Sequence, residues 1–315
     1  MKARLGLVVL VALAPALSFG GCASNKGETL DGPPVTPANP IADGFTSFSA
    51  IPKPGTSTLP GITTEASYTA PAPSFTVTGH STPALGAGSA TLTLDANGNL
   101  TAININGAQS SVSFSAANGS SSIALAAIGA PNANAFESAD RKNLAIVASP
   151  AGFGFDYQSF GIWATGRDTG SGNFGAISVG AATQNAALPT TGTTTYNGSA
   201  AGLYVDPAGQ TFLAAGTATL TANFATRSVN YATSGTAAVS GSTASPLANP
   251  AILNMQGNLA FAASSNDFSG SVSTSGMTGN AKGRFYGPAA NEAGGTFALT
   301  SSGVQTYVGA FGAKK

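Results

Sequence analysis

Residues that could carry chemistry are scarce in this chain of 315 residues. It holds one cysteine, Cys22, one histidine, His80, and one tryptophan, Trp163. No nucleophile, base and orienting group stand together around any of them, as covalent or acid–base catalysis would require. We therefore expect no enzyme, and we interpret His80, in the stretch VTGHSTPALG, as an ordinary exposed histidine of a loop.

Two further stretches resemble binding or catalytic motifs, but we expect neither of them to form a functional site. GSGNFG, residues 170–175, fits the pattern G-x-G-x-x-G, which binds a dinucleotide only between a parallel strand and a helix. The residues that follow offer no amphipathic helix of adequate length, so we reject a dinucleotide site. FESADRKN, residues 136–143, is expected to be a solvated charged loop.

The composition narrows the class of protein. Charged residues make up 8% of the chain, the formal net charge is zero, and apolar residues make up 43%. This is enough apolar material for a core, while nucleic-acid binding needs clustered Lys and Arg that are lacking here. Abundant Thr and Ser together with 41 glycines indicate an all-β protein with many turns.

The N-terminus predicts export and lipid attachment. Lys2 and Arg4 precede an apolar run at residues 5–19 that is short for a membrane span, so residues 1–21 read as a signal peptide. Cys22, in SFGGCASN, resembles the cysteine of a bacterial lipobox, which receives a diacylglycerol and palmitate-type acyl chains. A free buried cysteine is the alternative. Ala23, in place of aspartate, agrees with delivery to the outer membrane.

A tether and two β domains are expected to follow. Residues 22–44 hold four prolines and almost no large apolar residue, which predicts a disordered linker. Residues 45–187 form a β-rich domain with predicted hairpin turns at Asn97-Gly98 and Asn118-Gly119, and with room for a bulge between Leu100 and Ile103. Trp163 is expected to be a core or inter-domain anchor.

Residues 188–315 show the clearest strand pattern. Apolar residues alternate with Thr, Ser and Asn in runs such as TATLTANF, which predicts strands with one buried face. Eight antiparallel strands would close most simply into a barrel filled by side chains. The predicted runs are 196–205, 212–224, 229–239, 253–263, 268–274, 281–286, 295–300 and 307–312.

The stretch GRFYGPAANEAGGTFAL, residues 283–299, contains the end of one predicted strand and the start of the next. Lys282 and Arg284 should face water and Phe285 the interior, until Pro288 ends the strand. PAANEA is expected to form one helical turn, and Gly294-Gly295 a tight turn into the next strand.

This stretch, with the terminal YVGAFGAKK, resembles the end of the barrel domain in transferrin-binding protein B-like surface lipoproteins. LPTTGTTTYNGSAAG and YQSFGIW resemble the first barrel strand and the last strand of the preceding handle domain, so the resemblance covers residues 157–315. It implies a small antiparallel β-sheet handle followed by a soluble eight-stranded antiparallel barrel. Family members hold host proteins or haem at the cell surface, and the resemblance implies a surface-lipoprotein translocon and a TonB-dependent receptor as partners.

We therefore expect an outer-membrane surface lipoprotein, anchored through Cys22, that binds a host protein, haem or another solute, with iron acquisition as one role. Haem enters only through the resemblance, with His80 as its conceivable ligand; the residues themselves predict no cofactor and no metal. Loops poor in charged and aromatic residues argue against transferrin itself, and they leave a structural or adhesive envelope lipoprotein as the alternative. The terminal Lys-Lys and the lack of aromatic girdles argue against an integral outer-membrane barrel.

Overall fold

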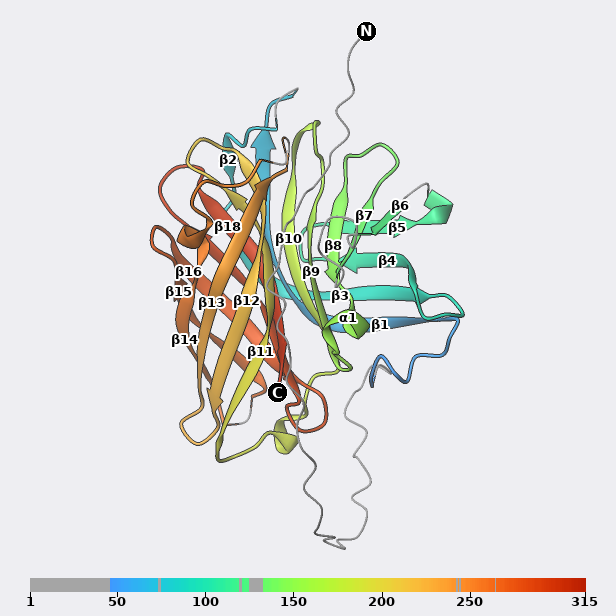
Figure 1. Ribbon diagram of the computed structural model, residues 1–315, viewed down its shortest axis with the longest axis vertical. Coiled ribbons are helices and arrows are strands. Elements are labelled where there is room, and N and C mark those ends of the chain that lie inside the picture. The colour runs from blue at the N-terminus through green and yellow to red at the C-terminus, as the bar shows by residue number, and fades with distance from the viewer. Residues whose placement is uncertain are drawn as a thin grey trace, which may run out of the picture.

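The computed structural model describes residues 46–315 except 73–74, 119–120, 125–132, 242, 244 and 264. The predicted signal peptide, Cys22 and the tether at 22–44 therefore lie outside the described residues. The predicted fold class is confirmed, because an antiparallel ten-stranded sheet is followed by a closed barrel of eight antiparallel strands (Figure 1). In the described part of the chain, no helix has the length and apolar character needed to cross a membrane.

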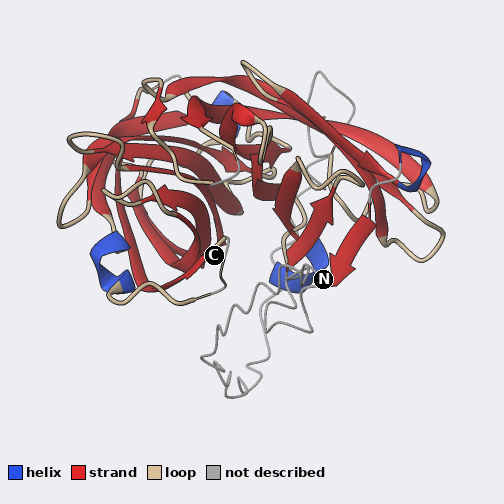
Figure 2. Ribbon diagram, turned by 90° about the horizontal axis from the view of Figure 1, so that it is seen from above, coloured by secondary structure: helices blue, strands red, loops and turns tan. Residues whose placement is uncertain are grey.

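The sheet has the strand order β5-β4-β3-β1-β10-β9-β8-β7-β6, with the short β2 paired to β1. Figure 2 shows it curling beside the barrel. Its strands are β1 (Gly55–Ala70), β2 (Gly79–His80), β3 (Ala84–Leu94), β4 (Leu100–Asn106), β5 (Ser111–Ser115), β6 (Ser121–Ala124), β7 (Ala133–Glu137), β8 (Leu144–Ala148), β9 (Gln158–Ala164) and β10 (Gly170–Gly180).

The concave side of the sheet encloses its own core. Trp163 is 1% exposed there, and the curl brings Phe114 of β5 to a ring distance of 5.9 Å from Phe136 of β7. Trp163 is thus a core residue of the sheet, as one of its two predicted roles had it. A Cβ on Gly175 would overlap the indole ring, so the β10 backbone can approach Trp163 only because this residue is glycine.

The local predictions for this sheet have mixed outcomes. The Asn97-Gly98 turn is confirmed, with Gly98 at φ 83°, and so is the bulge, because Leu100 pairs with Leu94 while Ala102 pairs with Thr93. The hairpin predicted around Asn118-Gly119 is wrong. The strands on either side of it do not pair with each other. Instead, β5 pairs with β4 and β6 pairs with β7, so that β5 and β6 form the two opposite edges of the sheet. GSGNFG lies inside strand β10, so the dinucleotide pattern has no strand–helix context.

The barrel contains all eight predicted runs and closes through the pairing of its first and last strands. Its strands are β11 (Thr193–Val205), β12 (Thr211–Asn223), β13 (Ser228–Ser240), β14 (Gln256–Phe261), β15 (Asp267–Ser273), β16 (Thr278–Tyr286), β17 (Glu292–Thr300) and β18 (Thr306–Lys314). Leu253, predicted at the start of a strand, ends the 3-10 turn Pro250–Leu253, because Pro250 favours the first turn of a helix.

Aromatic side chains fill the barrel. Phe285 is fully buried inside the barrel and contacts the rings of Phe268, Phe261 and Phe224 at 5.1, 5.5 and 5.4 Å. Phe285 therefore faces inward, as predicted.

Two predictions for residues 288–295 are wrong. No helical turn forms at 288–293, where hydrogen-bonded turns lead directly into β17 at Glu292. Gly294 and Gly295 make no tight turn either, because both lie within β17 and pair with β16 and β18.

Gly294 in β17 and Gly312 in β18 make room for the packing of the sheet on the barrel. A Cβ on Gly294 would overlap Gln158 Oε1 and lie 2.9 Å from Ser178 Oγ, and a Cβ on Gly312 would lie 2.6 Å from Phe160 Cδ1. Small outward-facing residues of β17 and β18 thus let β9 and β10 pack directly against the barrel wall. The two units also share a hydrophobic cluster, to which Phe160 and Phe174 contribute from the sheet.

Polar contacts cross the same interface. Thr64 Oγ1 donates to Thr296 Oγ1 at 2.7 Å, and the hydroxyls of Ser178 and Tyr286 lie 2.9 Å apart. Because these groups are buried and partnered, the interface fixes the two units in one arrangement.

Candidate functional site

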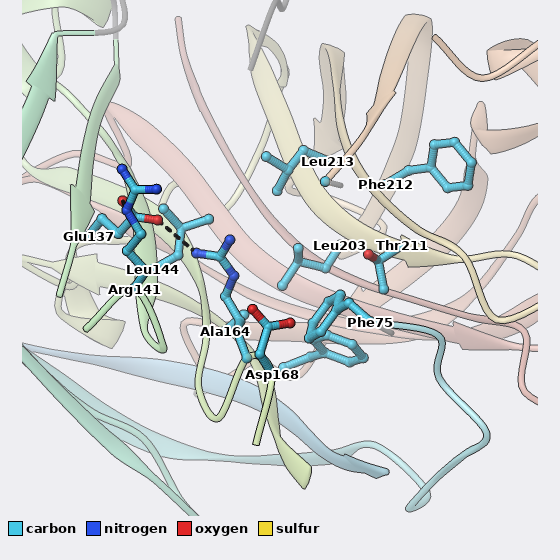
Figure 3. A pocket seen from close by; sticks show the side chains of 13 residues that line it. Phe75, Glu137, Arg141, Leu144, Ala164, Asp168, Leu203, Thr211, Phe212 and Leu213 are labelled. Carbon is cyan, nitrogen blue, oxygen red and sulfur yellow. Dashed lines mark hydrogen bonds and ion pairs between the residues drawn. The ribbon is translucent and has the colours of Figure 1, made fainter. Parts of the chain in front are cut away.

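A cleft of about 270 Å³ opens between one end of the sheet and the barrel wall (Figure 3). Segments distant in the sequence build it. The sheet contributes Glu137 at the end of β7 and Arg167 and Asp168 in the turn between β9 and β10. The barrel contributes Leu203 of β11 and Leu213 of β12.

One wall of the cleft carries an ion-pair cluster. Arg167 Nη1 donates to Glu137 Oε1 at 3.0 Å, and Arg141 Nε lies 3.6 Å from Glu137 Oε2. The side chains of Arg167 and Glu137 are 17% and 12% exposed, whereas that of Arg141 is 67% exposed. FESADRKN is therefore only partly the solvated loop that we predicted, because Glu137 is turned into the cleft.

The opposite wall is apolar. Leu203 and Leu213 project outward from the barrel and are 7% and 8% exposed, and Phe75, which follows β1, lies close to the cleft on the same side. A wall of aliphatic and aromatic carbon facing a charged wall can bind an amphipathic molecule. The described lining residues include no cysteine, histidine or serine that would act as a nucleophile or base.

His80 lies away from this cleft. It forms strand β2 with Gly79 and pairs with Tyr68, so it is half-buried in the sheet rather than exposed in a loop. Its Nδ1 is 2.8 Å from the carbonyl oxygen of Ser81, while its Nε2 has no partner among the described residues. Within those residues, no group of three His, Cys, Asp or Glu side chains could hold a metal ion, so nothing converges on His80.

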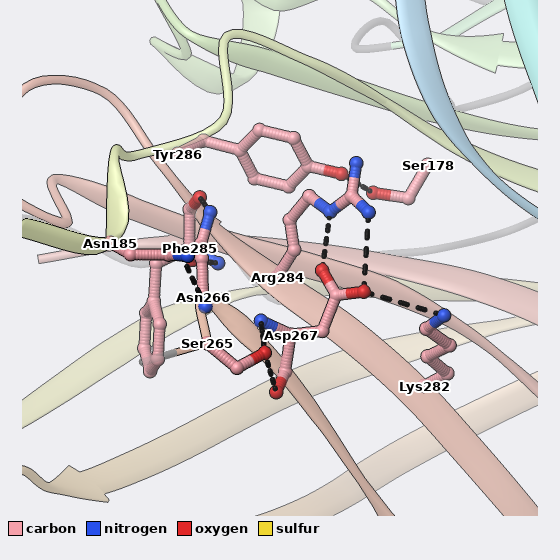
Figure 4. A network of polar contacts seen from close by, with 9 residues as sticks. All are labelled: Ser178, Asn185, Ser265, Asn266, Asp267, Lys282, Arg284, Phe285 and Tyr286. Carbon is pink, nitrogen blue, oxygen red and sulfur yellow. Dashed lines mark hydrogen bonds and ion pairs between the residues drawn. The ribbon is translucent and has the colours of Figure 1, made fainter. Parts of the chain in front are cut away.

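A second charged cluster lies on the outside of the barrel (Figure 4). Asp267 of β15 accepts two hydrogen bonds from Arg284, from Nε at 2.8 Å and from Nη2 at 3.3 Å, and lies 3.4 Å from Lys282 Nζ. Burial would raise the pKa of Asp267, but hydrogen bonds and charge from Arg284 and Lys282 outweigh it and lower this pKa. The cluster links β15 to β16, as expected for a structural role.

Sequence reasoning did not find the cleft. Its charged groups come from the end of β7, the turn after β7 and the turn between β9 and β10. Its apolar groups Leu203 and Leu213 lie on the outer face of β11 and β12, where most other residues are small or polar. One signal was available. In a chain with 8% charged residues, Glu137, Arg141, Arg167 and Asp168 lie within 32 positions of each other. Cys22, the predicted lipidation site, lies outside the described residues.

Comparison with known proteins agrees with the barrel. The family model described as C-lobe and N-lobe beta barrels of Tf-binding protein B matches residues 188–315. These residues include all eight strands of the closed barrel. A search of curated proteins by sequence found no match.

Solved structures with a similar arrangement include transferrin-binding protein B from Haemophilus parasuis, in its Trp-176-Ala mutant, at 13% identity and TM-score 0.43, covering 84% of this chain and 76% of that one. The isotype 1 protein from Neisseria meningitidis matches at 13% identity and TM-score 0.39, covering 83% and 77%. The N-lobe of lactoferrin-binding protein B from Moraxella bovis matches at 12% identity and TM-score 0.38, covering 81% and 99%.

Proposed function

We propose that this chain, whose residues 188–315 match the family model of the transferrin-binding protein B barrels, is a lipid-anchored surface protein of the bacterial outer membrane that binds a ligand. The observation that carries the proposal is the pairing of this barrel with a preceding sheet packed against it. The ligand is a host protein, haem or another solute, and iron acquisition is the role that the family favours. We propose binding rather than catalysis.

The anchor in this proposal is Cys22. The apolar run at residues 5–19 and the proline-rich residues 22–44 support a cleaved signal peptide followed by a tether. Two or more acyl chains on one cysteine suffice for stable membrane attachment. We divide the mature chain into the tether at 22–44, the sheet domain at 45–187 and the barrel domain at 188–315.

Metabolic labelling with an acyl probe tests the anchor. The chain should take up label, and Cys22→Ser should abolish it, with Ser24→Cys in that background as a control for position. Label that persists on Cys22→Ser would contradict lipidation at this residue.

Protease treatment of whole cells tests exposure. A surface protein should be degraded without cell lysis, and deletion of a surface-lipoprotein translocon should protect it. Protection in cells with an intact translocon would place the protein on the periplasmic side.

Capture by intact cells tests the ligand. Cells displaying the chain should retain one of three probes (transferrin, lactoferrin or haemin) more than cells displaying no chain. Growth on the retained compound should then depend on a TonB-dependent receptor. Cells that display the chain at the surface and retain none of these probes would count against iron acquisition.

A structural or adhesive envelope lipoprotein is the second candidate, and one observation favours it. Among the described residues, Leu85 is the only large hydrophobic side chain that is exposed. Tight protein interfaces are centred on Trp, Tyr and Arg anchors, so the outer surface offers little for a strong protein partner. Loss of envelope integrity or of cell adhesion upon deletion, without a growth defect under iron limitation, would support this candidate.

A further inference from the structure

The inter-domain cleft presents unpaired hydrogen-bond donors beside an apolar wall. Arg167 uses Nη1 to bind Glu137, and its Nε and Nη2 have no partner among the described residues. A guanidinium carries five N–H donors in a planar fork. Because this side chain is only 17% exposed, a bound acceptor would satisfy donors that water reaches poorly.

The free donors of Arg167, rather than the net charge of the lining, favour an acceptor. The charged lining consists of two guanidiniums, those of Arg141 and Arg167, and two carboxylates, those of Glu137 and Asp168. Glu137 pairs with both guanidiniums, whereas Asp168 is exposed in a left-handed conformation with φ 60°. A ligand carboxylate on Arg167 therefore gains hydrogen bonds from donors that Glu137 leaves free, and it meets repulsion from Glu137 and Asp168.

The apolar wall and the volume define the rest of the ligand. Leu203 and Leu213 on the barrel and Phe75 beside them can cover a hydrocarbon chain or ring. The volume of about 270 Å³ lies just below the range of roughly 300–1,000 Å³ that holds drug-sized molecules. The occupant is therefore smaller than a typical drug and far smaller than a protein or a haem group.

We propose that this cleft binds a small apolar monocarboxylate, with its carboxylate on the guanidinium of Arg167 and its hydrocarbon part against Leu203 and Leu213. The proposal rests on the proposed function only in that the chain is a ligand-binding protein. It adds a small-molecule site at the junction of the two units, distinct from any surface that contacts a host protein. A bidentate contact between guanidinium and carboxylate supplies the specificity.

Calorimetric titration of the full chain carrying Cys22→Ser tests the proposal with three probes that share an eight-carbon chain. Octanoate should bind, 1-octanol should bind at least about tenfold more weakly because it lacks the charge-assisted contact, and octylammonium should not bind. Octanol binding as tight as octanoate, or tighter binding of octylammonium, would overturn the assignment of a carboxylate ligand.

Variants locate the site. Arg167→Gln should weaken octanoate binding about tenfold or more, and Asp168→Asn should strengthen it by removing a carboxylate of the lining that repels the ligand. Arg227→Gln is the matched control, because Arg227 lies in the turn between β12 and β13, at the end of these strands opposite to Thr211 and Gly241 of the cleft. It should bind octanoate like the unmutated protein.

A second variant tests the site even if Arg167→Gln disturbs folding. Leu213→Phe fills the cleft and leaves every charge in place, so it should abolish octanoate binding while the circular dichroism spectrum stays the same. Octanoate binding that is absent at millimolar concentration, or unchanged in folded Arg167→Gln and Leu213→Phe, would overturn the proposal. Neither result would affect surface display or host-protein capture by cells, so failure of the proposed function is recognised separately.

Discussion

The carboxylate of Glu292, at the start of barrel strand β17, accepts a hydrogen bond from the backbone N–H of Asp156 at 2.7 Å. Its second oxygen accepts the N–H of Tyr157 at 3.2 Å, just before sheet strand β9. Asp156 in turn accepts hydrogen bonds from Ser49, from the backbone N–H at 2.8 Å and from the hydroxyl at 3.0 Å. One barrel carboxylate thus fixes a sheet segment, and that segment fixes the first described residues of the chain.

Glu292 should make the protein less stable as the pH rises from about 4.5 to about 7. Burial raises the pKa of Glu292 to about 7, although the backbone N–H groups of Asp156 and Tyr157 lower it and the charge of Asp156 adds to the increase. The folded state therefore keeps a proton that the unfolded state releases near pH 4.5, so the stabilisation is complete below that pH and is lost toward pH 7. The loss should be on the order of 3 kcal/mol in the free energy of unfolding.

Urea denaturation of Glu292→Gln across this pH range checks the prediction. Glutamine keeps an acceptor but has no proton to lose, so the variant should lack this part of the pH dependence. Burial also raises the pKa of Glu65, so the relevant quantity is the difference between the two proteins. An identical pH dependence for both would contradict the role of Glu292.

Gly294→Ala should destabilise the protein by about 2 kcal/mol, because the new methyl group collides with Gln158 where the sheet meets the barrel. Gly276→Ala is the matched control, since a Cβ there meets nothing within 4 Å. Thermal and chemical denaturation of both variants measure the difference. Equal stability of Gly294→Ala and Gly276→Ala would show that the interface between sheet and barrel can accommodate the added methyl group.

Tyr231→Phe should leave the stability unchanged or raise it by up to about 1 kcal/mol, because its buried hydroxyl has no partner among the described residues. Tyr196→Phe should lower the stability by about 1 kcal/mol, because the Tyr196 hydroxyl donates to the carbonyl oxygen of Ala290 at 2.8 Å. Both tyrosines lie inside the barrel, so the pair separates the hydrogen bond from the ring. The reverse order in urea midpoints would contradict the assignment of partners.

The sheet and the barrel should unfold together. Trp163, the only tryptophan, reports the sheet by fluorescence. The barrel tyrosines Tyr196, Tyr204, Tyr231 and Tyr307 contribute to the near-ultraviolet circular dichroism together with the aromatic residues of the sheet. Because the two units share a hydrophobic cluster, the two signals should change at the same urea concentration. Separate transitions would show that the interface contributes little to stability.

The barrel could be predicted from the sequence because its information is local. In β12, Ala218, Leu220 and Ala222 are buried, while Thr217 and Thr219 between them are exposed. This period of two specifies a strand, a buried face and hence a register without reference to any other segment. The resemblance added the expectation that the preceding β-rich domain is a small sheet, the handle.

The failures concern residues whose role depends on a distant segment. Gly294 and Gly295 suggest a turn when only their neighbours are considered, yet Gly294 makes room for Gln158 and Ser178 of the sheet, and Gly295 makes room for the Phe311 ring of β18. Glu292 looked like a residue of an exposed helical turn, but it is 4% exposed beneath the segment at 156–157. The cleft was missed for the same reason, because no single stretch contains both of its walls.

The segment fixed by Asp156 also places both ends of the described chain at one pole of the molecule. Ser49, three residues after the described part begins at Thr46, donates to Asp156, and the Lys314 ammonium near the other terminus donates to the carbonyl oxygen of Gly154 at 3.3 Å. Strand β9 then runs for 7 residues, about 20 Å, from this pole toward the turn that carries Arg167. Both ends of the described chain therefore lie at the opposite end of the sheet from the cleft, and neither obstructs its mouth.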